Sequence, residues 1–155
     1  MKHLRLIAVV TGYMLLCINC NRPNGETSQH RVIFEAGDMK VITVALDKKR
    51  KTMSVLFGNA LAYDAAKNFP DKHSPGEIFT LVTWEEVDNP NWYGATINGK
   101  VQLVEAVETT EAANGGIQFD YEVSHGAPSS INMRGASDDE RVQYILSMRS
   151  AVFPS

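Results

Sequence analysis

Cysteine is scarce in this chain of 155 residues, and its placement excludes several kinds of chemistry. The two cysteines, Cys17 and Cys20, both lie close to the N-terminus. Without a cysteine beyond Cys20, the rest of the chain has no internal disulfide, no cysteine nucleophile and no thiolate metal site. The haem attachment motif C-x-x-C-H and the Gly-x-Ser-x-Gly motif of many hydrolases are also missing. We therefore expect neither a metal site nor a hydrolase.

Long apolar runs are also lacking. The longest mostly apolar run covers residues 6–18, and these thirteen residues are too few to span a bilayer, which takes about 20. Lys2 and Arg5 precede the run and Cys20 follows it. This order is typical of an export signal with a lipoprotein processing site. We predict that residues 1–19 form the signal peptide and that Cys20 carries a lipid.

The segment before Cys20 departs from the usual lipoprotein motif, because its branched aliphatic residue is displaced by one position. A cleaved signal without lipid and a retained transmembrane anchor therefore remain alternatives. If Cys20 is acylated, residues 20–31 form a polar tether and residues 32–155 form one domain. We expect a bacterial cell-envelope protein, periplasmic or at the outer membrane, whose membrane partner is reached through Cys20.

Positive charge is in short supply after the signal peptide. Without Lys2 and Arg5, thirteen basic residues face eighteen acidic ones, a net charge of −5. Such a domain has no electrostatic reason to bind nucleic acid. The basic residues 48–51 stand together, and we interpret them as a solvated turn between two strands, with an anion or lipid-headgroup patch as the alternative.

Strand patterns dominate the remaining sequence. Runs of β-branched and alternating apolar residues predict five strands, at residues 41–46, 52–57, 77–86, 100–107 and 117–123. The strand at 77–86 is apolar on both faces, so both must be covered. Residues 88–91 end it. Asn98 and Gly99 predict a hairpin turn before the fourth strand, and residues 114–116 predict another before the fifth.

Two helices are predicted. Asn59 can cap a helix that reaches Asn68 and is stopped by Pro70. Ser137 and Glu140 have the spacing of a capping box, which begins a second, amphipathic helix. Val142, Ile145, Leu146 and Arg149 line this helix, which we expect to end near Pro154. Together these elements predict an α+β fold, an antiparallel sheet of about five strands with two packed helices.

Three segments carry a family resemblance. The sequences TMSVLFGN at residues 52–59, PGE and LVTW at residues 75–77 and 81–84, and NPNWYGA at residues 89–95 resemble the cytochrome P460 family. The resemblance covers roughly residues 40–108. It implies an exported, mostly antiparallel β domain that is often a homodimer. In haem-bearing members a c-type haem, attached through C-x-x-C-H and crosslinked to a lysine, oxidises hydroxylamine or binds nitric oxide.

The chain lacks that attachment motif, since no cysteine lies between His125 and Ser155. We favour a haem-free member that binds a ligand or has a structural role in the envelope, with no cofactor. The alternative is a noncovalent haem protein with redox or nitric oxide and hydroxylamine-related activity, an oxidoreductase if it is an enzyme. His73, His125 or Met133 could supply its axial ligand.

Aromatic residues are few, at 8% of the chain, yet Trp84, Trp92 and Tyr93 stand close together. The tryptophans are expected to fill the core. The alternative is that their rings border an apolar ligand pocket with Tyr93 beside them. Glu85 and Glu86 are neighbours on a strand and so point to opposite faces, which prevents them from acting on one substrate as a carboxylate pair.

Overall fold

The computed structural model describes residues 34–68, 73–131 and 135–148. The predicted signal peptide, Cys20 and the tether lie outside the described residues, as do Pro70, Met133 and Arg149. Among the residues that the structure describes, no helix is long and apolar enough to cross a membrane.

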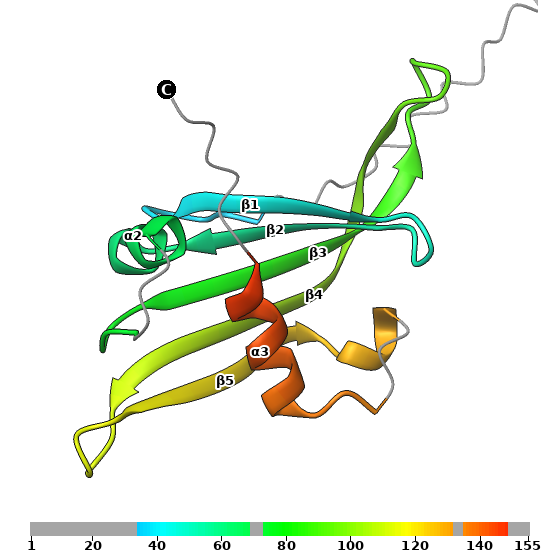
Figure 1. Ribbon diagram of the computed structural model, residues 1–155. Helices are drawn as coiled ribbons and strands as arrows, with labels where there is room; N and C mark the ends of the chain where they lie inside the picture. The colour runs from blue at the N-terminus through cyan, green and yellow to red at the C-terminus, as the bar shows by residue number, and fades with distance from the viewer. Residues whose placement is uncertain (1–33, 69–72, 132–134, 149–155) are drawn as a thin grey trace, which may run out of the picture.

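Five strands form one antiparallel sheet whose order in space is the order in the chain (Figure 1). A short 3-10 turn and two helices complete the fold. The elements are β1 (Lys40–Asp47), β2 (Thr52–Gly58), α2 (Ala60–Asn68), β3 (Ile78–Asp88), β4 (Thr96–Glu111), β5 (Ile117–Gly126), η2 (Pro128–Ile131) and α3 (Asp138–Ser147). The predicted α+β class, with a five-strand antiparallel sheet and two helices, is confirmed.

Both helices pack on the same face of the sheet, which we call the helical face. Ala62 of α2 and Ile145 of α3 belong to one apolar cluster with Leu56, Phe79 and Leu81 of the central strands. In Figure 1, α3 crosses in front of the sheet and α2 lies at one end of it. Burial of such a cluster supplies most of the free energy that holds helices to a sheet.

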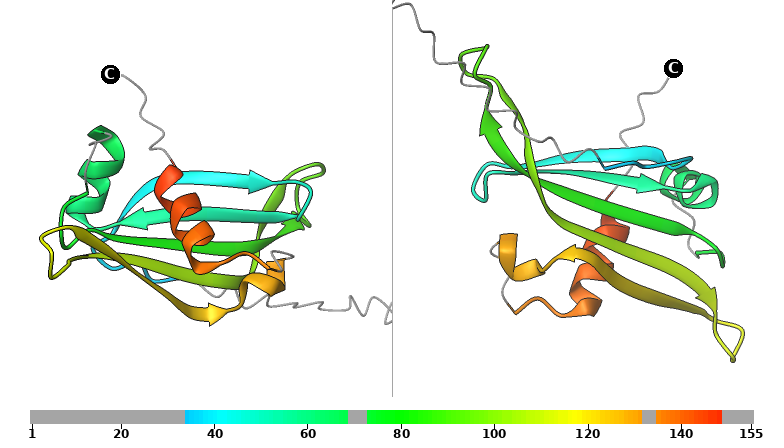
Figure 2. Two further views of the ribbon diagram at one scale, coloured as in Figure 1. Left: turned by 60° about the horizontal axis from the view of Figure 1, so that its bottom comes forward. Right: turned by 180° about the vertical axis from the view of Figure 1, so that it is seen from behind.

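The opposite face, which we call the open face, has a smaller cluster of Val82, Trp84 and Val104. Phe34, at the start of the described chain, packs on this cluster and its ring lies 5.3 Å from that of Phe57. Seen from behind, this face of the central strands has no helix over it in the described part of the chain (Figure 2). Residues 79–84 of β3 are all buried, as their apolar character on both faces predicts.

The helix caps agree with the sequence. Asn59 Oδ1 accepts a hydrogen bond from the Ala62 N–H at 2.9 Å, which satisfies one free donor of the first turn of α2. Ser137 and Glu140 form the predicted capping box, with hydrogen bonds of 3.2 and 3.0 Å. Val142 and Ile145 are buried as predicted, and Leu146 is half-buried.

The predicted hairpin turn at Asn98 and Gly99 is wrong, because both residues lie within β4. The turn between β3 and β4 is made by residues 89–95, where the Asn89 N–H donates to the Ala95 carbonyl at 2.8 Å. Gly99 lies where the pairing with β3 is irregular, and a Cβ there would stand 2.9 Å from Val87 Cγ1. The glycine therefore serves a close approach of two strands. The turn predicted at residues 114–116 is confirmed.

The β3–β4 hairpin extends past the rest of the sheet. β2 pairs with β3 as far as Glu85, and β5 pairs with β4 from Leu103 onward. Among the described strands, residues 86–88 and 96–98 therefore pair only with each other. In Figures 1 and 2 this end of the hairpin projects beyond the β1–β2 turn, away from α2.

Candidate functional site

The three aromatic residues singled out from the sequence lie in different surroundings. Trp84 is 7% exposed and belongs to the open-face cluster. Trp92 and Tyr93 lie in the turn at the tip of the hairpin and are 73% and 105% exposed. The prediction that Trp92 fills the core is wrong, because its turn lies beyond the last strand that could cover it. None of the three lines the cavities of about 630 and 210 Å³ found among the described residues.

The two candidate haem ligands lie on different elements, His73 before β3 and His125 on β5. His73 Nδ1 lies 2.6 Å from Glu77 Oε2, and its ring meets those of Phe79 and Phe119 edge to face. It is therefore held between a buried carboxylate and two aromatic rings. His125 is exposed near the end of β5, opposite Val104 in the pairing of β4 with β5.

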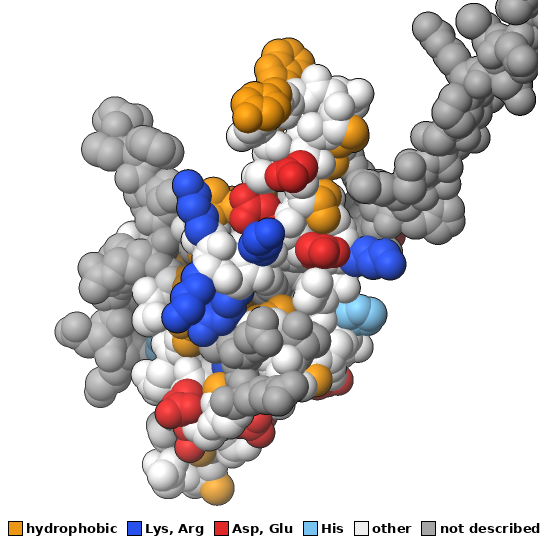
Figure 3. All heavy atoms as spheres, turned by 90° about the vertical axis from the view of Figure 1, so that its right-hand side faces the viewer, with side chains coloured by type: hydrophobic (Ala, Val, Ile, Leu, Met, Phe, Trp, Pro, Cys, Tyr) orange, Lys and Arg blue, Asp and Glu red, His pale blue; other side chains and the backbone are white. Residues whose placement is uncertain are grey.

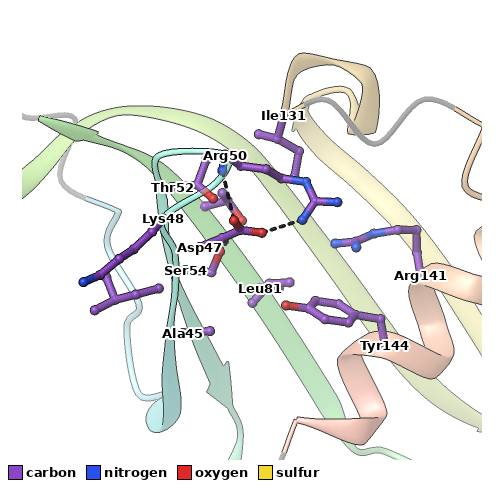
Figure 4. A pocket seen from close by; sticks show the side chains of 12 residues that line it. Ala45, Asp47, Lys48, Arg50, Thr52, Ser54, Leu81, Ile131, Arg141 and Tyr144 are labelled. Carbon is purple, nitrogen blue, oxygen red and sulfur yellow. Dashed lines mark hydrogen bonds and ion pairs between the residues drawn. The ribbon is translucent and has the colours of Figure 1, made fainter.

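The larger cavity, of about 630 Å³, opens on the helical face between the β1–β2 turn, η2 and α3 (Figure 4). In the figure Arg50 reaches in from the turn, while Arg141 and Tyr144 reach in from α3. Leu81 lies between them on the floor formed by β3. The lining comprises Ala45, Leu46, Asp47, Lys48, Arg50, Thr52, Ser54, Leu81, Thr83, Ile131, Arg141 and Tyr144.

The floor of the cavity carries hydroxyl groups beside the apolar cluster of the helical face. Ser54 Oγ and Thr83 Oγ1 are 2.9 Å apart and hydrogen bonded across β2 and β3. Thr52 lies on the same face, two positions before Ser54 on β2. Strand residues two positions apart share a face, so β2 contributes two hydroxyls to one side of the cavity. These groups can donate to or accept from a bound molecule.

One cation at the mouth has no carboxylate partner among the described residues. The Arg50 N–H donates to Asp47 Oδ1 at 2.9 Å and the Arg50 guanidinium pairs with Oδ2. These hydrogen bonds, the backbone one foremost, hold the pKa of Asp47 below its ordinary value. Asp47 and Arg50 thus offset each other's charge. Lys48 is exposed and lies at the rim, but in Figure 4 its side chain is directed away from Arg141 and Tyr144, so it reaches an anionic group at the mouth only by turning inward.

Behind the cavity, Arg141 belongs to a buried network. Glu105 of β4, fully buried, accepts two hydrogen bonds from Arg141, at 2.7 Å from Nε and 2.5 Å from Nη2. It accepts a third from the Tyr121 hydroxyl at 2.7 Å. Such bidentate pairs are rigid and strong, and their buried charges are tolerated because every oxygen is satisfied. The network fixes the wall that α3 presents to the cavity.

The same burial sets the protonation states. Burial first, and then the hydrogen bond to Glu105, raise the pKa of Tyr121 far above its usual range, so its hydroxyl keeps the proton that it donates. Burial acts to lower the pKa of Arg141, but the hydrogen bonds and charge of Glu105 outweigh it and the pKa is raised. Arg141 also stacks on Tyr144, with 4.8 Å from its guanidinium carbon to the ring centre.

The described lining contains neither histidine nor methionine, the two kinds of axial haem ligand expected from the sequence. Within residues 34–68, 73–131 and 135–148, no group of three His, Cys, Asp or Glu side chains could hold a metal ion. What the lining can do is bind and orient a small molecule. Its volume lies within the range of about 300–1,000 Å³ usual for ligand pockets.

Sequence patterns did not reveal the residues of this network, and neither Arg141 nor Glu105 was among the predicted site residues. Two signals were present. Glu105 has the same parity on β4 as buried Leu103 and Val107, and Arg141 lies four residues before buried Ile145 on α3. A charged residue at a core position of each of two elements is a sign of a buried ion pair.

No protein-family model matches this chain, and no curated protein matches it. The activity of the protein is therefore inferred from the geometry of its cavity and of its hairpin.

Proposed function

We propose that this protein is an exported, lipid-anchored protein of the bacterial cell envelope that binds a small organic molecule in the cavity between the sheet and α3. The cavity of about 630 Å³, with hydroxyl groups on its floor and a cation at its rim, is the observation that carries the proposal. The signal-like pattern of residues 1–19 and the position of Cys20 support the location in the cell envelope.

The lining favours a compact ligand with an apolar body and one acidic group. Leu81 and Ile131 are buried side chains that provide apolar contact. Ser54 and Thr83 can hydrogen bond to a polar substituent. Lys48, which points away from the cavity in Figure 4, would pair with a carboxylate at the mouth after its side chain turns inward. Because Asp47 is already paired with Arg50, an acidic ligand would not meet an uncompensated carboxylate.

A cytochrome P460-like fold without covalent haem is part of the proposal. It is supported by the antiparallel sheet with helices on one face and by the family-like segments, which fall on β2, on the residues just before β3, on β3 and on the turn after it. The homodimer implied by the resemblance stays a prediction. Noncovalent haem is the rival ligand, and a titration with haem distinguishes the two.

The test uses the purified full chain, screened by thermal shift against small aromatic and aliphatic monocarboxylates and then titrated calorimetrically. Ala45→Phe fills the cavity, and Val44→Phe is its matched control because Val44 is exposed and lies on the other face of β1. We expect the first variant to lose binding at least tenfold and the second to retain it. Lys48→Gln should weaken the binding of a carboxylate ligand about tenfold, which corresponds to the loss of a single charged contact. Lys49→Gln should leave that binding unchanged.

Two results would overturn this function. Monocarboxylates that all fail to bind, or that bind Ala45→Phe as well as wild type, would remove the cavity as the site. A stoichiometric Soret band on titration with haem, lost in His125→Ala, would replace the proposal by the haem protein. The lipid anchor is tested separately by acyl labelling, with Cys20→Ser as control, and an unlabelled wild type would remove it.

A further inference from the structure

The tip of the β3–β4 hairpin carries the most exposed aromatic pair among the described residues. Trp92 is 73% exposed and Tyr93 is 105% exposed, whereas Tyr144 reaches 43%. Figure 3 shows large hydrophobic side chains gathered at this projecting end of the molecule. An exposed indole beside an exposed phenol costs solubility and adds nothing to the core, so a partner that covers them is expected.

The tip is a built turn. The Trp92 N–H donates to the Asn89 carbonyl at 3.2 Å, and the Ala95 N–H donates to the Trp92 carbonyl at 3.2 Å. The Asn89 side chain also accepts from the Asn91 N–H at 2.9 Å. Gly94 has φ of +77°, which lets the chain reverse directly after the two aromatic residues. The hydrogen-bonded turn therefore holds the backbone of both aromatic residues in place, which lowers the conformational entropy lost on binding.

The tip is also uncharged. Residues 89–99 contain no Asp, Glu, Lys or Arg, and the nearest charges are Asp88 on one strand and Lys100 on the other. A strongly charged partner surface would gain nothing from such a tip, and an anionic lipid surface is not required. The exposed groups are aromatic rings, amides and backbone, which suit the zone where lipid headgroups meet acyl chains.

The start of the described chain lies near the root of this hairpin. Phe34 packs in the open-face cluster with Trp84 and Val101, the pair next to the point where the hairpin leaves the sheet. Cys20 precedes Phe34 by fourteen residues, a span of at most about 50 Å when extended. From Glu85 to Trp92 the hairpin extends at most about 24 Å. A lipid on Cys20 would therefore hold the bilayer within reach of the tip.

We propose that Trp92 and Tyr93 form a membrane-docking tip that inserts into the interfacial zone of a zwitterionic bilayer. This inference rests on the envelope location and lipid anchor of the proposed function, and adds that the domain stands in a fixed orientation on the membrane. The tip supplies a second contact beside the acyl chain, as stable anchoring by two signals requires.

The two tryptophans allow a direct test with the full chain reconstituted into vesicles of phosphatidylcholine and phosphatidylethanolamine that carry brominated acyl chains. Trp84→Phe leaves Trp92 as the single tryptophan, and Trp92→Phe leaves Trp84 as the matched control. We expect the emission of Trp92 to shift to the blue and to lose at least half its intensity by quenching. The emission of Trp84, which is buried, should change little. Addition of 0.5 M salt should leave the quenching in place.

Each other result overturns the docking tip. If the protein floats with the vesicles while Trp92 is not quenched, the lipid anchor stands and the tip fails. If the emission of Trp92 shifts to the blue as the protein concentration rises in the absence of lipid, a second copy of the chain covers the tip. If neither flotation nor quenching is seen, the tip and the anchor fail together, whereas ligand binding in the cavity is measured without vesicles and is unaffected by these outcomes.

Discussion

Two parts of the β3–β4 hairpin lie in opposite surroundings, one covered by the domain and the other exposed. Toward the body of the domain, Glu105 is fully buried and accepts hydrogen bonds from Arg141 and Tyr121. At the tip, Trp92 and Tyr93 are largely exposed. The carboxylate of Glu105 is thus buried and the indole of Trp92 is exposed, which is the reverse of the usual preference of each residue type. The difference teaches that coverage by neighbouring elements, and not polarity alone, decides where each side chain lies.

Coverage also separates what each end does. Around Glu105, β5 and α3 provide partners for every charge, so substitutions there should change the free energy of unfolding. In the described sheet, residues 86–88 and 96–98 pair with no third strand, although the Glu86 N–H donates to the Lys51 carbonyl at 2.8 Å. Substitutions at the tip should therefore change association and leave stability alone.

The largest effect is expected from breaking the buried ion pair. Arg141→Met leaves the Glu105 carboxylate buried without its counter-charge, which should lower the free energy of unfolding by about 3–5 kcal/mol. Urea denaturation measures the loss. The double variant Arg141→Met with Glu105→Leu replaces both charges by apolar groups and should recover most of it. A single variant as stable as wild type would show that the pair does not hold α3 to the sheet.

A smaller effect is expected from the third member of the network. Tyr121→Phe removes a hydrogen bond to a charged acceptor and should cost about 1–2 kcal/mol at neutral pH. The pKa of Tyr121 is raised in the folded state, so the folded protein holds this proton more tightly than the unfolded chain does.

The stabilisation linked to that proton is present below the ordinary tyrosine pKa of about 10 and is lost as the pH rises above it. Wild type should therefore lose stability more steeply than Tyr121→Phe above about pH 10. Thermal melts at pH 8 and pH 11 measure the two slopes. Parallel slopes would contradict the assignment of this hydrogen bond to Glu105.

The smallest effect on stability is expected at the tip. Trp92→Ala and Tyr93→Ala should each change the free energy of unfolding by less than about 0.5 kcal/mol, because neither side chain is buried against the domain. The same urea assay measures this. A loss above 1 kcal/mol would mean that the rings pack on the domain, and the contrast between the two ends of the hairpin would fail.

Sequence patterns predicted the elements of the fold well, because each of them has a local cause. The capping box at Ser137 and the turn at residues 114–116 depend on nearby hydrogen bonds alone. The turn predicted at Asn98 and Gly99 was wrong because a glycine suits both a tight turn and a close approach of strands. The choice between them was made by the pairing of β3 with β4.

The cavity and the exposure of Trp92 could not be predicted in the same way. Arg141 meets Glu105 across 36 residues of chain, and Arg50 comes to the same cavity from the β1–β2 turn. These long-range contacts depend on how α3 crosses the sheet, and no short sequence motif encodes that crossing. The position of Trp92 depended on where β2 and β5 stop pairing, and strand ends are the least defined feature of a sequence pattern.

The order of the five strands has a consequence for how the chain is assembled. Each strand pairs with the one made just before it, so the sheet can grow one hairpin at a time as the chain emerges. Arg141 lies in α3, the last helix, and so it follows Glu105 of β4 by 36 residues in the chain. Until that helix is made, Glu105 faces an uncovered sheet and can stay hydrated. We expect α3 to dock last, and a chain cut before Asp138 should leave Glu105 without its partner Arg141.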